Sequence, residues 1–243
     1  MLNLTEYYQW FHHYYSNFYS SDPDIMRMVE LKENHSIRVA KNARDLAEHI
    51  GLPLKKINVA ELIGLFHDIA RSEQAHLKTF NDSLSFDHGD RGVVRLEETG
   101  ILDTLDIKSR ENILFSIKYH NKMTTPSTSP DKMLFTGIIK DADKLDIFRI
   151  LPPIVAEHDY SPILIELLKE GRVLPYSEIK TMADKRLIRL GWIYDINYQW
   201  TLAQLVNEGY VDGLIKALPD TPQFNEIKDH IKDYIAAKMS ESM

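Results

Sequence analysis

The chain has 243 residues, enough for one large domain or for one domain with a small appendage, and its 44% hydrophobic and 27% charged residues are ordinary for a globular protein. The 36 acidic residues exceed the 29 basic ones, and the formal net charge of -7 argues against a broad nucleic-acid-binding face. The absence of cysteine excludes disulfides, thiolate nucleophiles, iron–sulfur clusters and cysteine zinc sites, so any metal must bind to imidazole and carboxylate groups.

Neither a membrane span nor a signal peptide is expected. No uninterrupted apolar run approaches the ~18–20 residues of a membrane-spanning helix. The N-terminus is rich in aromatic residues and lacks a cationic start followed by a plain apolar stretch. We therefore expect a cytoplasmic protein without a membrane partner.

Helical periodicity begins near the N-terminus. An aromatic-rich helix is expected over residues 3–19, packed on the body of the protein. Asp22 and Pro23 offer a cap and a first-turn proline for a long helix over 24–50, and Gly51 is a good stop signal for that helix.

The next helix, over residues 55–70, carries an apolar stripe and a face of small residues. Ala60 and Gly64 on this face would let another helix approach closely and would leave room beside the His67 imidazole. Residues 71–87, which follow, are polar and are expected to be irregular.

Helices alternate with polar connections over the rest of the chain. Asp87 is expected to cap a helix that ends at Gly100. The polar stretch 121–131 forms a lid, a substrate wall or a flexible surface connection. A turn at Asp195 could join a short strand pair over 191–200. Further helices are expected over 107–121, 132–148, 160–170, 177–190, 198–206, 209–217 and 223–238.

Metal-binding side chains occur in three separated stretches, each in or beside a segment with helical apolar periodicity. These side chains are His35, the doublet His67-Asp68 and Asp143. Two histidines and two carboxylates suit a divalent cation at a shared centre. Two further histidines between the second and third stretches make the supply large enough for two metals; they are His88 and His120.

The local sequence around these side chains favours ligands over surface residues. The doublet ends the apolar segment GLFHDIA, Asp143 lies in IIKDADKLD, and His120 lies in ILFSIKYH on an apolar face. A single histidine would more often be structural, but buried charges of this kind usually have partners. A divalent ion among them lowers the pKa of coordinated water, and the resulting hydroxide can attack phosphorus.

These segments resemble the HD-domain superfamily of metal-dependent phosphohydrolases. The resemblance rests on ENHSIRVAKNARDLAEHIGLP, ELIGLFHDIARSEQ, DHGDRGVVRLEETGIL, ILFSIKYHNK and IIKDADKLDIFR, with His35, His67, Asp68 and Asp143 as the ordered signature. It implies an all-α fold, an HD-domain helical bundle with additional N- and C-terminal helices. We expect a single domain over 1–243, with the HD core at 24–150 and a C-terminal extension over 151–243 packed on that core.

His88 and His120 look like the second-metal ligands of dinuclear members of the superfamily, such as the bacterial diadenosine tetraphosphate hydrolases and the HD-GYP cyclic dinucleotide phosphodiesterases. The resemblance implies that Asp68 bridges the two ions. It also assigns Asp143 rather than Asp141 as a ligand, and Asp141 is expected to face solvent. The GYP motif is absent, which makes cleavage of a cyclic dinucleotide less favoured.

Arg71 departs from the related nucleotidases, which place a glutamate three positions after the doublet, and is closer to the HDxxK pattern of the dinuclear members. It either binds substrate phosphate or complements a helix dipole. The other cations near the ligands either bind phosphate or form solvated ion pairs; they are Arg38, Lys122, Lys144 and Arg149. The expected catalytic residues are Asp68, Arg71 and Lys144.

The sequence thus predicts a metal-dependent phosphohydrolase that cleaves an ester or anhydride of a nucleotide or another small phosphorylated metabolite by metal-activated water. One or two divalent ions are expected, with iron or manganese favoured over nickel, cobalt, zinc and magnesium. No nucleic-acid partner is expected, and the oligomeric state is left open. The ligands alone leave two alternatives, an HD-fold di-iron oxygenase and a non-catalytic, metal-bound sensor or interaction module.

Overall fold

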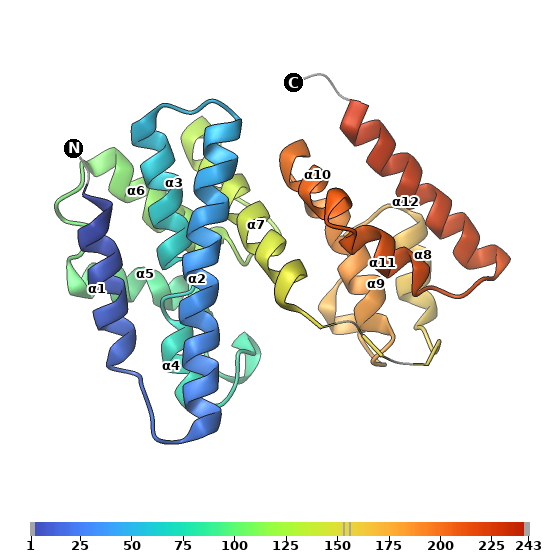
Figure 1. The fold of residues 1–243 in the computed structure, drawn as a ribbon, viewed down its shortest axis with the longest axis horizontal. Coiled ribbons are helices and arrows are strands. Elements are labelled where there is room, and N and C mark those ends of the chain that lie inside the picture. Colours follow the sequence, from blue (N-terminus) through green and yellow to red (C-terminus); the bar gives the residue numbers. More distant parts are fainter. Residues whose placement is uncertain (1–2, 153, 156, 241–243) are drawn as a thin grey trace. The chain divides into compact units, whose positions relative to one another are not determined.

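The computed structural model describes residues 3–152, 154–155 and 157–240, and all the regular structure in these ranges is helical (Figure 1). The chain divides into two compact units, Met1–Asp146 and Ile147–Met243. The prediction of an all-α fold is confirmed. The prediction of one domain, with the C-terminal extension packed on the core, stays a prediction.

The first unit contains two helices, α2 and α5, that begin where the sequence signals them. Its elements are α1 (Leu4–Ser16), α2 (Pro23–His49), α3 (Leu54–Phe66), α4 (Arg71–His76), the 3-10 turn η1 (Asp82–Leu84), α5 (His88–Thr99), α6 (Ile107–Tyr119) and α7 (Pro130–Ile150), whose last turn belongs to the second unit. The Asp22 carboxylate accepts hydrogen bonds from two N–H groups of the first turn of α2, with Pro23 as the first helical residue. The Asp87 carboxylate caps α5, which ends at Gly100 in the left-handed conformation.

Helices α2 and α3 lie in close contact because Gly64 has no side chain. A Cβ atom at Gly64 would lie only 2.6 Å from the Cα of Ala40, so the two backbones almost touch at this point. His35 precedes Ala40 on one helix and His67 follows Gly64 on the other. This crossing therefore brings the two imidazoles together, and the predicted close approach at Gly64 is confirmed.

The aromatic helix α1 packs on α3, as the sequence predicts, and Figure 1 shows α1, α2 and α3 side by side. Phe11 and Tyr15 are completely buried. The ring of Phe66 lies 6.3 Å from that of Phe11 and 5.7 Å from that of Trp10, centroid to centroid. Each fully buried aromatic or aliphatic side chain contributes roughly 1.5–3 kcal/mol, so α1 is part of the core rather than a loose extension.

Two expectations about the first unit are wrong. Residues 71–87 are not simply irregular, because α4 and η1 lie within them and Ser72 and Gln74 are buried. Gln74 is stabilised there by hydrogen bonds from its amide to Asp82 and to two later residues of the same stretch. Asp141 does not face solvent, because α7 is buried on all sides over residues 135–142.

The second unit is built from short helices. Its elements are α8 (Pro162–Lys169), η2 (Tyr176–Glu178), α9 (Asp184–Gly191), η3 (Trp192–Asp195), α10 (Gln199–Asn207), α11 (Tyr210–Lys216) and α12 (Pro222–Ser240). The expected strand pair over 191–200 is wrong, because this stretch forms η3 and the start of α10. The helix expected over 177–190 begins only at Asp184, whose buried carboxylate accepts hydrogen bonds from Ser161 and Thr181 and joins the starts of α8 and α9. Within the described ranges, no helix combines the length and apolar character that a membrane crossing needs.

Candidate metal centre

The doublet His67-Asp68 lies directly after the last turn of α3, at the middle of the first unit. Both residues are buried, with 0% and 2% of their surface exposed. The hydroxyl of Tyr15 on α1 donates a hydrogen bond to the backbone oxygen of Asp68, at 3.3 Å. The aromatic helix therefore helps to fix the position of the doublet.

One carboxylate oxygen of Asp68 faces a first group of ligand atoms. Asp68 Oδ2 lies 3.6 Å from His35 Nε2 and 3.5 Å from His67 Nε2. Asp143 Oδ1 on α7 lies 3.0 Å from His35 Nε2 and 3.7 Å from His67 Nε2. Three segments of the chain thus bring two imidazoles and two carboxylates to one point, a set that suits a borderline divalent cation.

The other carboxylate oxygen of Asp68 faces a second group. Asp68 Oδ1 lies 3.4 Å from His88 Nε2 and 3.8 Å from His120 Nε2, and these two ring nitrogens are 3.0 Å apart. His88 is the first residue of α5, and His120 directly follows α6. Each group, with its own oxygen of Asp68, could hold one ion. The structure therefore brings together all six predicted ligands, and their ligation of a metal stays a prediction.

Two of the four imidazoles are oriented by the helices that end beside them. His67 Nδ1 lies 2.8 Å from the backbone oxygen of Gly64, and His120 Nδ1 lies 2.7 Å from that of Ile117. A carbonyl oxygen can only accept, so both rings carry their proton on Nδ1. Their Nε2 atoms then present a lone pair to the centre, which is the form of histidine that binds metals.

The other two imidazoles are oriented by carboxylates. His35 Nδ1 lies 2.6 Å from Asp146 Oδ2, and His88 Nδ1 lies 2.6 Å from Asp82 Oδ2. Arg38 in turn donates two hydrogen bonds to Asp146, at 2.7 and 3.0 Å. A carboxylate behind a histidine fixes the ring and increases the basicity of the nitrogen that faces a metal.

The residues present fit a bound cation. The Nε2 atoms of His35 and His67 are buried and face carboxylate oxygens of Asp68 and Asp143, but neither atom makes a hydrogen bond of acceptable geometry to a described residue. An unpaired polar atom in the interior costs free energy, and coordination to an ion would remove this cost. The side chain of Asp143 is 21% exposed whereas that of His35 is 1% exposed, so the first group opens to solvent on the α7 side.

Two cations balance the charge of Asp68. Lys32 Nζ lies 2.6 Å from Asp68 Oδ2, and Arg71 Nε lies 3.4 Å from Asp68 Oδ1. Burial alone would raise the pKa of the Asp68 carboxyl, but Lys32, His67 and Arg71 outweigh burial and hold that pKa well below its ordinary value. Burial lowers the pKa of His88, which favours the neutral, metal-binding form of this ring.

The predicted phosphate-binding cations lie in different surroundings. Arg71 is the nearest to the centre, with its Nη2 atom 3.3 Å from His88 Nε2. Arg38 is held by Asp146, and Lys122 forms ion pairs with carboxylates at the start of α5. Lys144 follows Asp143 on α7 and is partly exposed. Their binding of phosphate, and the expected catalytic roles of Asp68, Arg71 and Lys144, stay predictions.

Sequence reasoning missed two residues that the structure places at the centre. Lys32 lies three positions before His35 on the same helix, and this spacing alone puts the two side chains on one face. Asp82 lies in the stretch that was expected to be irregular, where no periodicity indicates which residue faces inward. Lys32 could therefore have been found from the sequence, and Asp82 could not.

The first unit is all-α and contains a buried centre of histidines and aspartates that could hold metal. These features place the protein among helical proteins with a candidate metal centre. The family follows from comparison with known families, because residues 33–147 match the HD domain. Residues 33–147 are therefore an HD domain, as the resemblance implies, and HD domains are largely metal-dependent hydrolases. All six candidate ligands lie within the matched residues. Comparisons with curated proteins and with solved structures found no match to the chain.

Proposed function

We propose that this protein is a phosphohydrolase that uses two divalent cations and acts on a small phosphorylated substrate, with nucleotides as the first candidates. One observation carries the proposal: the two oxygens of the Asp68 carboxylate face two separate groups of buried imidazoles. A carboxylate between two groups of this kind is suited to bridge two ions. A single structural ion would not require the second group.

The first cation would be held by Asp68 together with His35, His67 and Asp143. The second would be held by the same aspartate together with His88 and His120. Bound divalent cations would lower the pKa of coordinated water and stabilise the charge that develops on the phosphoryl oxygens. The histidine-rich ligand set favours iron or manganese over magnesium.

The chain's own cations would hold the substrate. The Arg71 guanidinium lies beside both Asp68 and His88, so it is within reach of a phosphate placed over the centre. Hydrogen bonds to Gln74 and to the backbone oxygen of Phe80 fix its position. A guanidinium fixed in this way can pair with a phosphate without losing further conformational freedom.

The test compares the wild-type chain with Asp68→Asn after both have been loaded with Fe²⁺ or Mn²⁺ under anaerobic conditions. Metal content is measured by elemental analysis, and phosphate release is measured on a panel of nucleoside mono-, di- and triphosphates and dinucleoside polyphosphates. We expect Asp68→Asn to lose at least one ion and nearly all turnover. Asp45→Asn, which removes only an exposed pair with Lys41 on α2, should change neither.

Three outcomes would contradict the proposal. Full turnover by metal-depleted Asp68→Asn would exclude the assigned centre. Retained metal without turnover on any phosphate ester would favour the sensor or interaction module. Dioxygen consumption by the iron-loaded protein, without phosphate release, would favour the oxygenase.

A further inference from the structure

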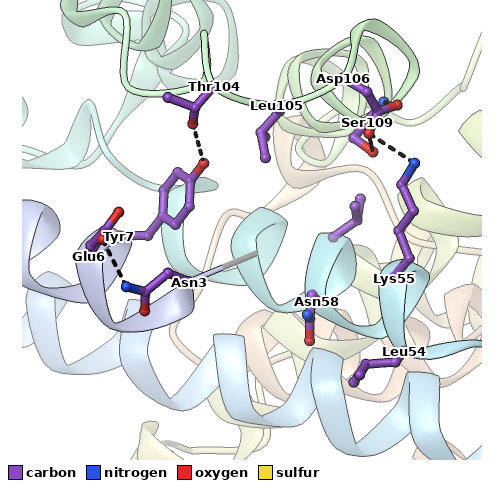
Figure 2. A pocket seen from close by; sticks show the side chains of 11 residues that line it. Asn3, Glu6, Tyr7, Leu54, Lys55, Asn58, Thr104, Leu105, Asp106 and Ser109 are labelled. Carbon is purple, nitrogen blue, oxygen red and sulfur yellow. Dashed lines mark hydrogen bonds and ion pairs between the residues drawn. The ribbon is translucent and has the colours of Figure 1, made fainter. Parts of the chain in front are cut away.

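A cavity of about 690 Å³ lies in the first unit, and none of its lining residues belongs to the metal centre. It is formed by the start of α1, the first turns of α3 and the connection between α5 and α6, as Figure 2 shows. Asn58 in its wall lies in α3, and His67 at the centre directly follows that helix nine positions later, which separates them by about 14 Å along the helix axis. The volume is in the range of small-molecule sites, about 300–1,000 Å³.

The wall of this cavity contains an amide that makes no hydrogen bond to the described part of the chain. Asn58 is only 7% exposed and lies within the continuously buried run from Ile57 to Phe66. Its side chain forms no hydrogen bond with any residue that the structure describes, and it lines the cavity. The Asn58 amide is not fully enclosed by the protein, so its nitrogen and oxygen reach the cavity space. They therefore offer a hydrogen-bond donor and an acceptor to a ligand in this cavity.

The charges around the cavity disfavour an anionic ligand. Lys55 is paired with Asp106, at 2.9 Å, and Glu6 is the other charged residue of the lining. One lysine and two acidic groups give the lining a formal charge of −1. A phosphate would therefore be repelled, and an uncharged molecule fits better.

The remaining side chains offer hydroxyl, amide and apolar contacts. The Thr104 hydroxyl is hydrogen-bonded to that of Tyr7, and the Ser109 hydroxyl donates to Asp106, so both can still accept from a ligand (Figure 2). The Asn3 amide donates to Glu6 and keeps its oxygen as an acceptor. Apolar surface comes from side chains of all three segments: Tyr7, Leu54, Val59 and Leu105. Such a lining can hold a flat ring against apolar groups while its polar edge meets amides.

We propose that this cavity binds an uncharged nucleoside whose base pairs with the Asn58 amide. A primary amide presents an acceptor and a donor side by side in one plane, and the edges of adenine and uracil present the complementary pair. The Glu6 carboxylate would accept hydrogen bonds from the ribose hydroxyls. Residues 3–7 lie outside the part of the chain that matches the HD domain, so α1 builds this site in addition to that domain.

The test is titration calorimetry with adenosine and uridine on the metal-free full chain, with methyl glucoside as a ligand that carries hydroxyls but no base. We expect saturable binding of at least one nucleoside and none of the glucoside. Asn58→Leu should weaken binding at least about tenfold. Asp68→Asn should bind as the wild type does, because the metal centre is separate.

Asn112→Leu is the matched control. Asn112 is also buried without a described hydrogen bond, but it lines a neighbouring cavity of about 130 Å³, too small for a nucleoside. This variant should leave nucleoside binding unchanged. Absence of nucleoside binding by the wild type, equal binding by Asn58→Leu, or equal binding of the glucoside would each overturn the proposal.

Discussion

Asp82 should control the second metal site selectively, and Asp82→Asn tests this. The Asp82 Oδ2 atom lies 2.6 Å from His88 Nδ1, while Oδ1 accepts hydrogen bonds from Arg71 and Gln74 at 3.1 and 3.0 Å. The carboxylate therefore keeps the ring proton on Nδ1. His88 Nε2, which faces Asp68, is then free to bind an ion.

Asparagine would reverse this preference. Its oxygen would turn toward the two donors Arg71 and Gln74, and its NH₂ group would then face the His88 ring. That arrangement favours the proton on Nε2 and removes the lone pair that the second ion needs. Loss of such a supporting group typically weakens metal binding 10- to 100-fold, which corresponds to about 1.4–2.7 kcal/mol.

The assay is competition of the protein with a chromophoric chelator for Mn²⁺ or Co²⁺, with stoichiometry checked by elemental analysis. We expect Asp82→Asn to weaken one of two sites and to leave the other near its wild-type affinity. Asp146→Asn is the matched variant, because Asp146 supports His35 in the first group in the same way. Equal loss at both sites in Asp82→Asn, or no loss at either, would refute the reasoning.

Four further outcomes are expected. Lys32→Met should increase the affinity for a divalent ion at least about tenfold, because two cations about 4 Å apart near a surface repel by about 4 kcal/mol per charge pair. The same variant should destabilise the metal-free chain, because Asp68 loses a counter-charge. Metal titration measures the first effect and thermal unfolding the second. A divalent ion at 100 times its dissociation constant should add about 2.7 kcal/mol of stability, and an unchanged unfolding temperature with and without chelator would contradict this. Gly64→Ala should reduce the free energy of unfolding in urea by roughly 1–3 kcal/mol, because its Cβ would meet the Ala40 backbone, and an unchanged midpoint would disprove the close approach. The pKa of Asp68 is lowered in the folded, metal-free chain, so the ionised Asp68 carboxylate stabilises the fold. This stabilisation is complete above the ordinary carboxyl pKa of about 3.9 and is lost as the pH falls below it. Circular dichroism should therefore show a weaker acid dependence in Asp68→Asn.

The helices that could be predicted from the sequence are those with local signals. Asp22, Pro23, Asp87 and Gly100 mark the ends of α2 and α5, and the structure uses each of them as predicted. The stretch 71–87 could not be predicted, because its polar residues are stabilised by hydrogen bonds between turns rather than by an apolar face. A pattern of apolar spacing carries no information about such bonds.

The strand pair over 191–200 was a different kind of error. Asp195 and Asn197 are residue types that can form the turn of a strand pair, yet Asp195 ends a single 3-10 turn in which Ile193 is buried. The contact of Trp192 with Phe148, at 5.6 Å between ring centroids, joins residues far apart in the chain. Tertiary packing of this kind overrides the local preference for a strand.

The candidate ligands could be predicted from their order along the chain, but the ion pairs that these ligands form could not. His35, His67 and Asp143 lie in segments whose apolar faces must turn inward, so their convergence follows from helix packing. Lys32 and Asp82 act through ion pairs with a ligand, and those pairs depend on the folded geometry. The residues able to bind a metal are therefore easier to identify from a sequence than the residues that set the charge and the orientation of those ligands.

The charges around Asp68 explain how the centre can form before a metal binds. A buried carboxylate without a counter-charge would be strongly unfavourable, and Lys32 and Arg71 supply that charge at 2.6 and 3.4 Å. A divalent ion at Oδ2 of Asp68 would replace the ion pair with Lys32, and an ion at Oδ1 would replace the ion pair with Arg71. The displaced side chain would then remain beside the centre as a positive group without its carboxylate, which is the group that a phosphate needs. We therefore expect Lys32→Met to raise KM for a phosphorylated substrate even though the variant binds the metal more tightly, and a variant with tighter metal binding and unchanged KM would show that Lys32 serves the metal-free fold alone.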